Sequence, residues 1–299
     1  MARRKIKINR FLPYSRQFID EEDMRVVSNV LKENLITQGP KIASFEKSFA
    51  KYVGSKFAVA CATGTAALHL SCQDLKLGQG NNLLTSPITF IASANCAQFV
   101  GADTHFADID SKSYCISPTS LEKELKKKKI DIVVVVHMSG HSANLEEIYK
   151  LKKKYDFKII EDACHALGGF YKKHRIGSCY YSDISTFSFH PVKSITSGEG
   201  GMITTNNKKI YESLLIFRTH GIHNNQNHFL NHEMAFDNKG KVNSWYYEMP
   251  ELGFNYRITD IQAALGESQL KKIEKFSLMK KQLLILPSIF FLLILSIFF

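Results

Sequence analysis

A run of four valines, Val133–Val136, limits the fold more than any other feature of this chain. β-Branched side chains favour an extended backbone, and an unbroken apolar run is typical of a strand that is buried on both faces. Shorter apolar runs alternate with helical patterns before and after it. This alternation predicts an α/β fold in which a mixed, mainly parallel sheet lies between helices.

The individual elements are predicted from apolar periodicity and from end signals. Asp20 is the expected N-cap of a helix over 21–35, and Gly54 is expected to close a second amphipathic helix. The pair Ser117-Pro118 opens a later helix with a cap and a first-turn proline. The predicted strands are 57–61, 83–85, 105–109, 130–138, 158–162, 185–189 and 202–205. The other predicted helices are 65–76, 91–99 and 145–155.

Composition limits the class of protein. The chain has 299 residues, of which 44% are hydrophobic, so one large domain or two small ones can bury a sizeable core. Its six cysteines include no Cys-x-x-Cys pair and are interpreted as reduced thiols. No apolar run follows the first five residues, so a signal peptide is not expected. These features predict a cytoplasmic protein.

The formal net charge is +11, from 39 lysines and arginines against 28 aspartates and glutamates, which raises the question of nucleic-acid binding. The charge is spread along the chain, and its densest run, Lys126–Lys129, ends a predicted helix, where lysines complement the helix dipole. The sequence has neither zinc-finger spacing nor an RNA-binding aromatic signature. We therefore expect no nucleic-acid partner and no metal site. A small anionic substrate, however, would suit the positively charged surface.

Three segments hold side chains that are suited to chemistry. Ala62–Leu68 follows a strand and opens a helix with small residues, so its N–H and hydroxyl groups could bind a phosphate. Asp162 ends a buried strand, which is where ligands of open α/β sheets bind. Lys193 follows an apolar strand and a proline turn, and the glycine-rich turn Gly198–Gly201 comes next.

Each segment also has an ordinary interpretation. The first is equally a plain strand-to-helix turn, the aspartate is equally a helix cap, and an exposed lysine is usually a solvated surface residue. His165, three residues after the aspartate, is equally a satisfied core histidine. Together, however, the segments supply what pyridoxal 5'-phosphate (PLP) requires: a lysine for its aldehyde, a carboxylate for its pyridine nitrogen and a cradle for its phosphate.

Longer motifs carry a resemblance to a known family. In chain order they are Pro87–Phe90 with Ala92–Asn95, Glu161–Gly168, Phe187–Lys193 with Glu199–Gly201, and Leu252–Arg257 with Asp260–Ala264. With these motifs in register, the chain from about Tyr14 to about Phe276 resembles the DegT/DnrJ/StrS family of PLP-dependent sugar-nucleotide aminotransferases. The resemblance implies the large domain of the type I PLP aminotransferase fold.

The resemblance also implies roles for individual residues. Lys193 would be the Schiff-base lysine and proton shuttle, and Asp162 would pair with the pyridine nitrogen. Phe90 and His165 would pack near opposite faces of the cofactor ring. The cofactor phosphate would be bound by Thr63, Gly64, Thr65 and Ser188.

Further residues would serve the substrate and a partner subunit. Thr37 and Gln38 belong to a segment similar to the entrance loop of the family, and with His190 they would lie near the sugar substrate. Asn255 would reach the cofactor phosphate of the partner subunit. The resemblance therefore implies a homodimer with shared active sites.

Three stretches are most similar to the branch of the family that acts in pseudaminic acid synthesis: Phe187–Lys193, Arg218–Ile222 and Trp245–Met249. This likeness implies amination at C4 of a UDP-linked 4-keto-6-deoxy-N-acetyl hexosamine, with glutamate as amino donor, for nonulosonic acid or other surface glycan synthesis. A sugar 3-dehydratase of the same fold is the alternative enzyme. Those relatives carry histidine in place of the lysine, so Lys193 argues against it.

The C-terminus departs from the family, whose members continue with a small C-terminal domain. Here the sequence passes into Leu283–Phe299, an uncharged run of 17 residues, slightly short of the ~20 that span a bilayer. We expect a truncated or frameshifted product with that domain largely missing; a membrane segment is the competing interpretation. An inactive remnant that still binds PLP is the alternative function. The expected division is 1–250 for a PLP-binding large domain with an N-terminal helical segment, 251–282 for the start of a C-terminal segment, and 283–299 for the apolar tail.

Overall fold

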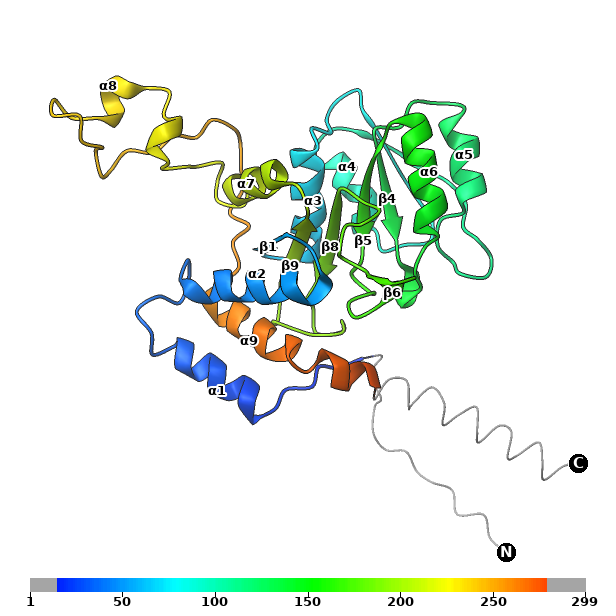
Figure 1. Cartoon of the computed structure of the whole chain (residues 1–299), viewed down its shortest axis with the longest axis horizontal. Helices are drawn as coiled ribbons and strands as arrows, with labels where there is room; N and C mark the ends of the chain where they lie inside the picture. Colours follow the sequence, from blue (N-terminus) through cyan, green and yellow to red (C-terminus); the bar gives the residue numbers. More distant parts are fainter. Residues whose placement is uncertain (1–14, 279–299) are drawn as a thin grey trace, which may run out of the picture.

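The computed structural model describes residues 15–278, whose main sheet has seven strands with helices against both faces (Figure 1). The strands lie in the order β1-β9-β8-β5-β4-β2-β3. Their bounds are β1 Phe57–Cys61, β2 Asn82–Thr85, β3 Asp103–Phe106, β4 Ile132–Val136, β5 Lys158–Asp162, β8 Ile184–Ser188 and β9 Gly201–Thr205. Among these seven, β9 is antiparallel to both neighbours and the other pairs are parallel, which confirms the predicted mixed, mainly parallel sheet.

Helices connect the strands and cover the sheet. They are α1 Glu21–Val30, α2 Pro40–Val53, α3 Gly64–Asp74, α4 Ala92–Gln98, α5 Pro118–Leu125, α6 Leu145–Tyr155, α7 Lys208–Phe217, α8 His232–Ala235 and α9 Asp260–Leu270. Two short 3-10 turns, η1 Met138–Gly140 and η2 Gln226–His228, and a small hairpin of β6 Phe170–Tyr171 and β7 His174–Arg175 complete the described elements.

β4 is the buried strand that the valine run predicts, because all five of its residues are buried. Val133 and Val135 pack into the core on one face of the sheet, together with apolar residues of α2, α5 and α6. Val134 and Val136 pack into the core on the other face, with residues of α3, α4 and α7. Side chains alternate along a strand, so one apolar run fills both cores and holds β4 inside the sheet.

The first helix ends earlier than the sequence predicts, at Val30 instead of residue 35. The carbonyl of Ile36 accepts a hydrogen bond from the N–H of Asp260 at 3.0 Å, and Thr37 forms a β-bridge with Thr259. Because residues 36 and 37 pair with this distant segment in a β-bridge, they cannot continue the helix. The predicted N-cap of this helix, Asp20, is confirmed.

The part of the chain assigned from sequence to a C-terminal segment, 251–282, contributes α9, which packs against α1 and α2 (Figure 1). The carboxylate of Asp23 is fully buried and accepts hydrogen bonds from Ser268 at 2.6 Å and Gln269 at 2.7 Å. The division of the chain at residue 250 stays a prediction, and the apolar run 283–299 lies outside the described residues. No helix within 15–278 is long and apolar enough to cross a membrane.

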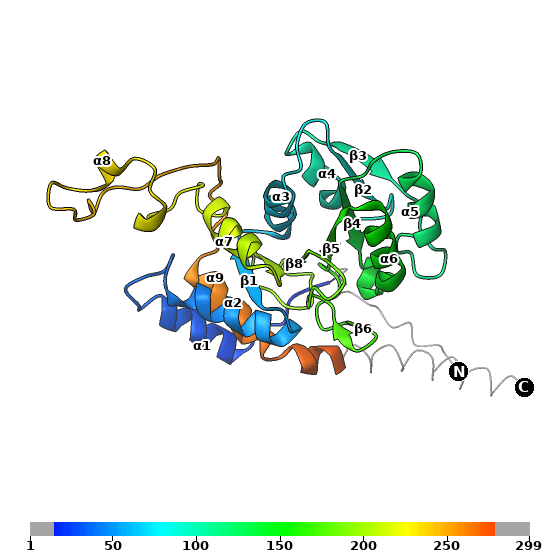
Figure 2. The ribbon, with the colours of Figure 1, turned by 45° about the horizontal axis from the view of Figure 1, so that its top comes forward.

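Residues 222–252 form an arm that projects from the rest of the molecule (Figures 1 and 2). Its small centre contains the buried side chains of Phe229 and Ala235, and the carboxylate of Glu248 accepts backbone hydrogen bonds beside it. At the root of the arm Gly221 has a φ of 73°, and an added Cβ there would lie 1.8 Å from the carbonyl oxygen of Glu251. Glycine is therefore required where the two ends of the arm cross.

Asp74, at the end of α3, shows what burial of a carboxylate does to stability. Burial raises the pKa of Asp74 from 3.8 to about 6, although a hydrogen bond from Ser213 and the charge of Lys76 oppose the shift. Since the folded state then binds the proton more tightly than the unfolded state, stability decreases as the pH rises from about 4 through 6. After a discount for partial solvent contact, Asp74→Asn should raise the free energy of unfolding by roughly 1–2 kcal/mol at pH 8 and change it little at pH 4. Urea unfolding at both pH values measures this difference, and an equal change at both would contradict it.

Candidate active site

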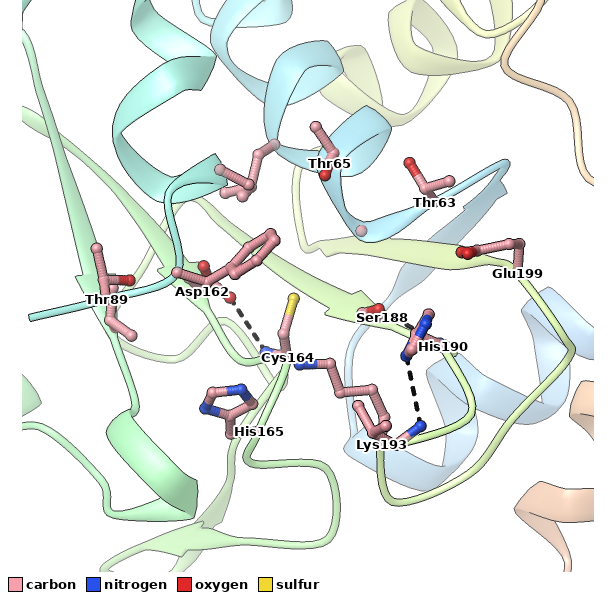
Figure 3. A pocket seen from close by; sticks show the side chains of 16 residues that line it. Thr63, Thr65, Thr89, Asp162, Cys164, His165, Ser188, His190, Lys193 and Glu199 are labelled. Carbon is pink, nitrogen blue, oxygen red and sulfur yellow. Dashed lines mark hydrogen bonds between the residues drawn. The ribbon is translucent and has the colours of Figure 1, made fainter. Parts of the chain in front are cut away.

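A pocket of about 470 Å³ opens where β5 and β8 end and where α3 and α4 begin. The carboxyl ends of parallel strands are the usual place for ligands in open α/β sheets. Figure 3 shows the pocket from close by. Nine of the twelve residues predicted for the site line it: Thr63, Gly64, Thr65, Phe90, Asp162, His165, Ser188, His190 and Lys193. The sheet therefore brings together segments as far apart in sequence as Thr63 and Lys193.

The N-terminus of α3 forms one wall of the pocket. The hydroxyl oxygen of Thr63, the N-cap, accepts a hydrogen bond from the N–H of Ala66 at 3.0 Å. The N–H groups of Gly64 and Thr65 lie in the first turn, where a helix has no partner for them. An added Cβ on Gly64 would lie 2.8 Å from the Cβ of Ser188, so glycine lets α3 approach β8 closely. This wall offers N–H groups, hydroxyls and the positive end of a helix dipole to an anion.

Asp162 ends β5 with its carboxylate directed into the pocket and only 6% of its surface exposed. The Ser93 hydroxyl of α4 donates to Oδ2 at 2.6 Å, and the N–H of Cys164 donates to Oδ1 at 3.2 Å. The Thr89 hydroxyl is hydrogen-bonded to that of Ser93 at 2.8 Å. Thr89 and Ser93 belong to the motif Pro87–Phe90 with Ala92–Asn95, but the sequence analysis assigns neither of them a role in the site. These donors compensate the burial of the carboxylate and fix its orientation.

Lys193 lies in the loop that joins β8 to β9. Its N–H donates to the carbonyl of His190 at 2.9 Å, and the Thr196 hydroxyl donates to the carbonyl of Phe189 at 2.9 Å. These bonds close a tight turn at the pocket edge. The Lys193 side chain extends from this turn toward Cys164, on the side of the pocket where the Asp162 carboxylate lies (Figure 3).

The pKa values of Cys164 and His165, in the loop that follows β5, are both shifted by burial. Burial, with a smaller effect of the charge of Lys193, lowers the pKa of His165, so its imidazole is neutral at pH 7. A neutral ring can pack on a flat ligand without the cost of burying a charge. Burial, and after it the charge of Asp162, raises the pKa of the Cys164 thiol well above its usual range. That thiol stays protonated and is a poor nucleophile.

Three of the predicted site residues lie outside this pocket. Gln38 lines a separate hollow of about 230 Å³, which also contains Arg218 and Arg257. Thr37 precedes it on the same loop, and Asn255 is exposed on a neighbouring segment. Within one copy of the chain these side chains do not meet the pocket that contains the lysine.

Known proteins are similar to this chain in sequence and fold. A model of the DegT/DnrJ/EryC1/StrS aminotransferase family matches residues 17–286. A UDP-4-amino-4,6-dideoxy-N-acetyl-beta-L-altrosamine transaminase of Campylobacter jejuni is 39% identical over 265 residues, which are 88% of this chain and 65% of that protein. Helicobacter pylori PseC, an aminotransferase involved in the biosynthesis of pseudoaminic acid, superimposes with a TM-score of 0.78 at 32% identity, over 88% of this chain and 66% of that one.

A third relative is recorded with a cofactor. The putative sugar aminotransferase Spr1654 of Streptococcus pneumoniae, in its PLP form, superimposes with a TM-score of 0.77 at 27% identity, over 88% of this chain and 67% of that one. The chain spans 65% of the length of the first curated relatives that it matches. Because the family model covers most of the sequence and the fold agrees, the chain belongs to the DegT/DnrJ/EryC1/StrS aminotransferase family.

Proposed function

We propose that this chain is a PLP-dependent aminotransferase that moves the amino group of glutamate to C4 of a UDP-linked 4-keto-6-deoxy-N-acetyl hexosamine. The observation that carries the proposal is one pocket that contains Lys193, the Asp162 carboxylate and the N-terminus of α3. The name of the C. jejuni relative describes a sugar with an amino group at C4, and a 4-keto sugar is the precursor that transamination to such a product requires. We place the product in nonulosonic acid or other surface glycan synthesis.

The residues of the pocket fit PLP. A volume of about 470 Å³ lies within the range of small-molecule sites, roughly 300–1,000 Å³. The close approach of α3 to β8 at Gly64 leaves the helix N-terminus open to a phosphate, with the hydroxyls of Thr63, Thr65 and Ser188 beside it. Asp162 is held by donors on both oxygens, which fix the orientation of its carboxylate toward a pyridine nitrogen.

Each residue would then have a defined task. The Nζ of Lys193 would bind the aldehyde carbon of the cofactor and, once released, would remove the proton from the Cα of glutamate in one half-reaction and deliver a proton to C4 of the sugar in the other. Asp162 would hold the proton on the pyridine nitrogen, and Phe90 and His165 would pack on the ring faces. With its pyridine protonated, PLP supplies the electron sink that transamination needs. His190, at the pocket edge, would contact the sugar, and Thr37 and Gln38 would reach the sugar from a second copy of the chain.

The positions of Thr37, Gln38 and Asn255 support a homodimer. They lie away from the pocket of their own subunit, and Asn255 is exposed, so a second copy can use them. We propose that they complete the site of the partner subunit. All six cysteines are free thiols, which supports a reducing compartment, the cytoplasm.

The direct test is to incubate the purified chain with PLP, glutamate and the 4-keto sugar nucleotide. The expected result is a lysine-bound PLP absorbance band together with amino sugar and 2-oxoglutarate in equal amounts. A protein that shows the band but makes no amino sugar would reject amination by this chain and favour the inactive remnant. A protein without the band would reject PLP as its cofactor.

Ser93→Ala tests the hydrogen bond to Asp162. Without the hydroxyl the carboxylate is less firmly oriented, and we expect kcat to fall by roughly 10- to 100-fold, because a hydrogen bond to a charged group is worth about 1.5–3 kcal/mol. Ser93→Thr retains the hydroxyl and should restore most of the rate. Steady-state kinetics of the three proteins decide the matter; equal kcat values for Ala and wild type would show that the bond has no role in turnover.

A further inference from the structure

Glu161 stands directly before Asp162 on β5 and is just as deeply buried, with 2% of its surface exposed. Successive side chains of a strand point to opposite faces, so Glu161 shares its face with Ile159 and the core beside α6, not with the pocket. A carboxylate in an apolar core is costly unless its oxygens are satisfied. The proposed chemistry does not explain why the chain buries the carboxylate of Glu161 at this position.

Donors from two other segments satisfy this carboxylate. The ring of His137 is hydrogen-bonded to Oε2 through Nε2 at 2.8 Å, and its side chain is fully buried. The hydroxyl of Ser185 on β8 donates to Oε1 at 3.1 Å, and the hydroxyl of Ser182 donates to the same oxygen. Glu161 thus ties β5 to the end of β4 on one side and to β8 on the other.

His137 uses both of its ring nitrogens. Nδ1 accepts a hydrogen bond from the N–H of Ala143 at 3.2 Å, so Nε2 carries the proton that is donated to Glu161. The ring therefore anchors both ends of the turn from residue 137 to residue 143. Within that turn Ser139 and Gly140 have left-handed backbones, with φ of 52° and 88°.

This network touches the pocket at two backbone positions. Val136 and Asp162 are paired residues of β4 and β5, and the N–H of the next residue, His137, donates to the carbonyl of Asp162 at 3.1 Å. The turn lies against the residue behind the pocket, because an added Cβ on Gly140 would lie 3.1 Å from the carbonyl oxygen of His165. Two of the three side chains that β5 and its following loop present to the pocket, those of Asp162 and His165, are thus backed by the same buried pair.

We infer that Glu161 and His137 are positioning residues, which hold Asp162 and His165 in the orientation that binds the cofactor ring. This inference rests on the proposed function. The pair acts through the backbone: it fixes the end of β5 between β4 and β8, and it fixes the turn on which His165 rests. Neither side chain touches the pocket itself.

Glu161→Leu is the test, because leucine has a similar size but accepts no hydrogen bond. In metal sites, loss of such a supporting partner weakens binding by roughly 10- to 100-fold, and for PLP we expect about tenfold weaker binding in an absorbance titration. Glu161→Gln keeps an acceptor for His137, and the serine hydroxyls can rotate to accept from its amide. It should restore affinity to within about threefold of wild type.

Thr205→Val is the matched control for a purely structural effect. Thr205 is buried at the end of β9 that lies away from the pocket, and its hydroxyl donates to the carbonyl of Asp183 at 2.8 Å. It should lower the melting temperature without a change in PLP affinity. If Glu161→Leu does not fold, Ser185→Ala removes one donor and is expected to weaken PLP binding about twofold to threefold.

The outcomes separate this inference from the proposed function. Wild-type protein that binds no PLP would reject the proposed function. Wild-type binding with unchanged affinity in Glu161→Leu, or in Ser185→Ala when the leucine variant does not fold, would overturn only the positioning role. Weaker binding in Glu161→Leu that Glu161→Gln restores, beside an unaffected Thr205→Val, would support it.

Discussion

Lys193→Ala is expected to abolish the lysine-bound PLP absorbance band and to lower the rate of amination by at least about 10⁴-fold. Two functions disappear with the amine: the covalent link to the cofactor and the proton transfer at the reacting carbon, of which proton transfer alone contributes roughly 10²- to 10⁴-fold. The Nζ atom points across the pocket, and no other lysine lines it among the described residues. Absorbance spectra and single-turnover rates measure both effects.

A lysine on the strand that carries Asp162 supplies the control. Lys158 is exposed at the first position of β5, four residues before the carboxylate, and Lys158→Ala should leave the spectrum and the rate unchanged. Added methylamine should restore part of the activity of Lys193→Ala, since a small amine can replace the lost proton carrier in an intact cavity. A spectrum of Lys193→Ala that matches wild type would reject Lys193 as the cofactor lysine.

Asp162→Asn is expected to lower kcat by roughly 10²- to 10³-fold, the usual effect of removing one preorganised electrostatic group. The amide has the same shape, but it has no negative charge to keep a pyridine nitrogen protonated. Protein stability should change little, because the amide oxygen can accept from the N–H of Cys164 while the Ser93 hydroxyl rotates to accept from the amide NH2. The expected signature is therefore a large loss of turnover with the cofactor still bound.

The matched control replaces a carboxylate outside the pocket. Asp156 is exposed, ends α6 in a left-handed conformation that asparagine tolerates, and lies six residues before Asp162. Asp156→Asn should retain full activity. If Asp162→Asn retained a kcat within about threefold of wild type, the carboxylate would not be the partner of the pyridine nitrogen.

Much of the fold and part of the site follow from local sequence. A strand needs only a short run of β-branched residues, so Val133–Val136 sufficed to predict the buried β4. Asp162 and Lys193 could be singled out because each stands where a predicted strand gives way to a loop. Parallel strands carry such ends to a common edge, which is why most of the predicted residues meet in one pocket.

Other features depend on which elements pack together. The hydrogen bond from Ser93 to Asp162 joins residues 69 positions apart, and the bond from His137 to Glu161 spans 24. The sequence around Ser93 or His137 does not predict which distant residue it will bond to, because helix and strand signals extend over only a few residues. In the same way α1 ends at Val30 because the chain beyond it pairs with residues near Asp260.

The valine run and the residues at strand ends thus determined the kind of sheet and the candidate chemistry, since both arise from backbone preferences and side-chain periodicity. Tertiary structure decided which hydroxyls hold the Asp162 carboxylate, that Glu161 lies behind it, and that Asn255 is exposed outside the pocket. The physical reason is that a hydrogen bond between distant residues forms only when packing has brought both elements into register.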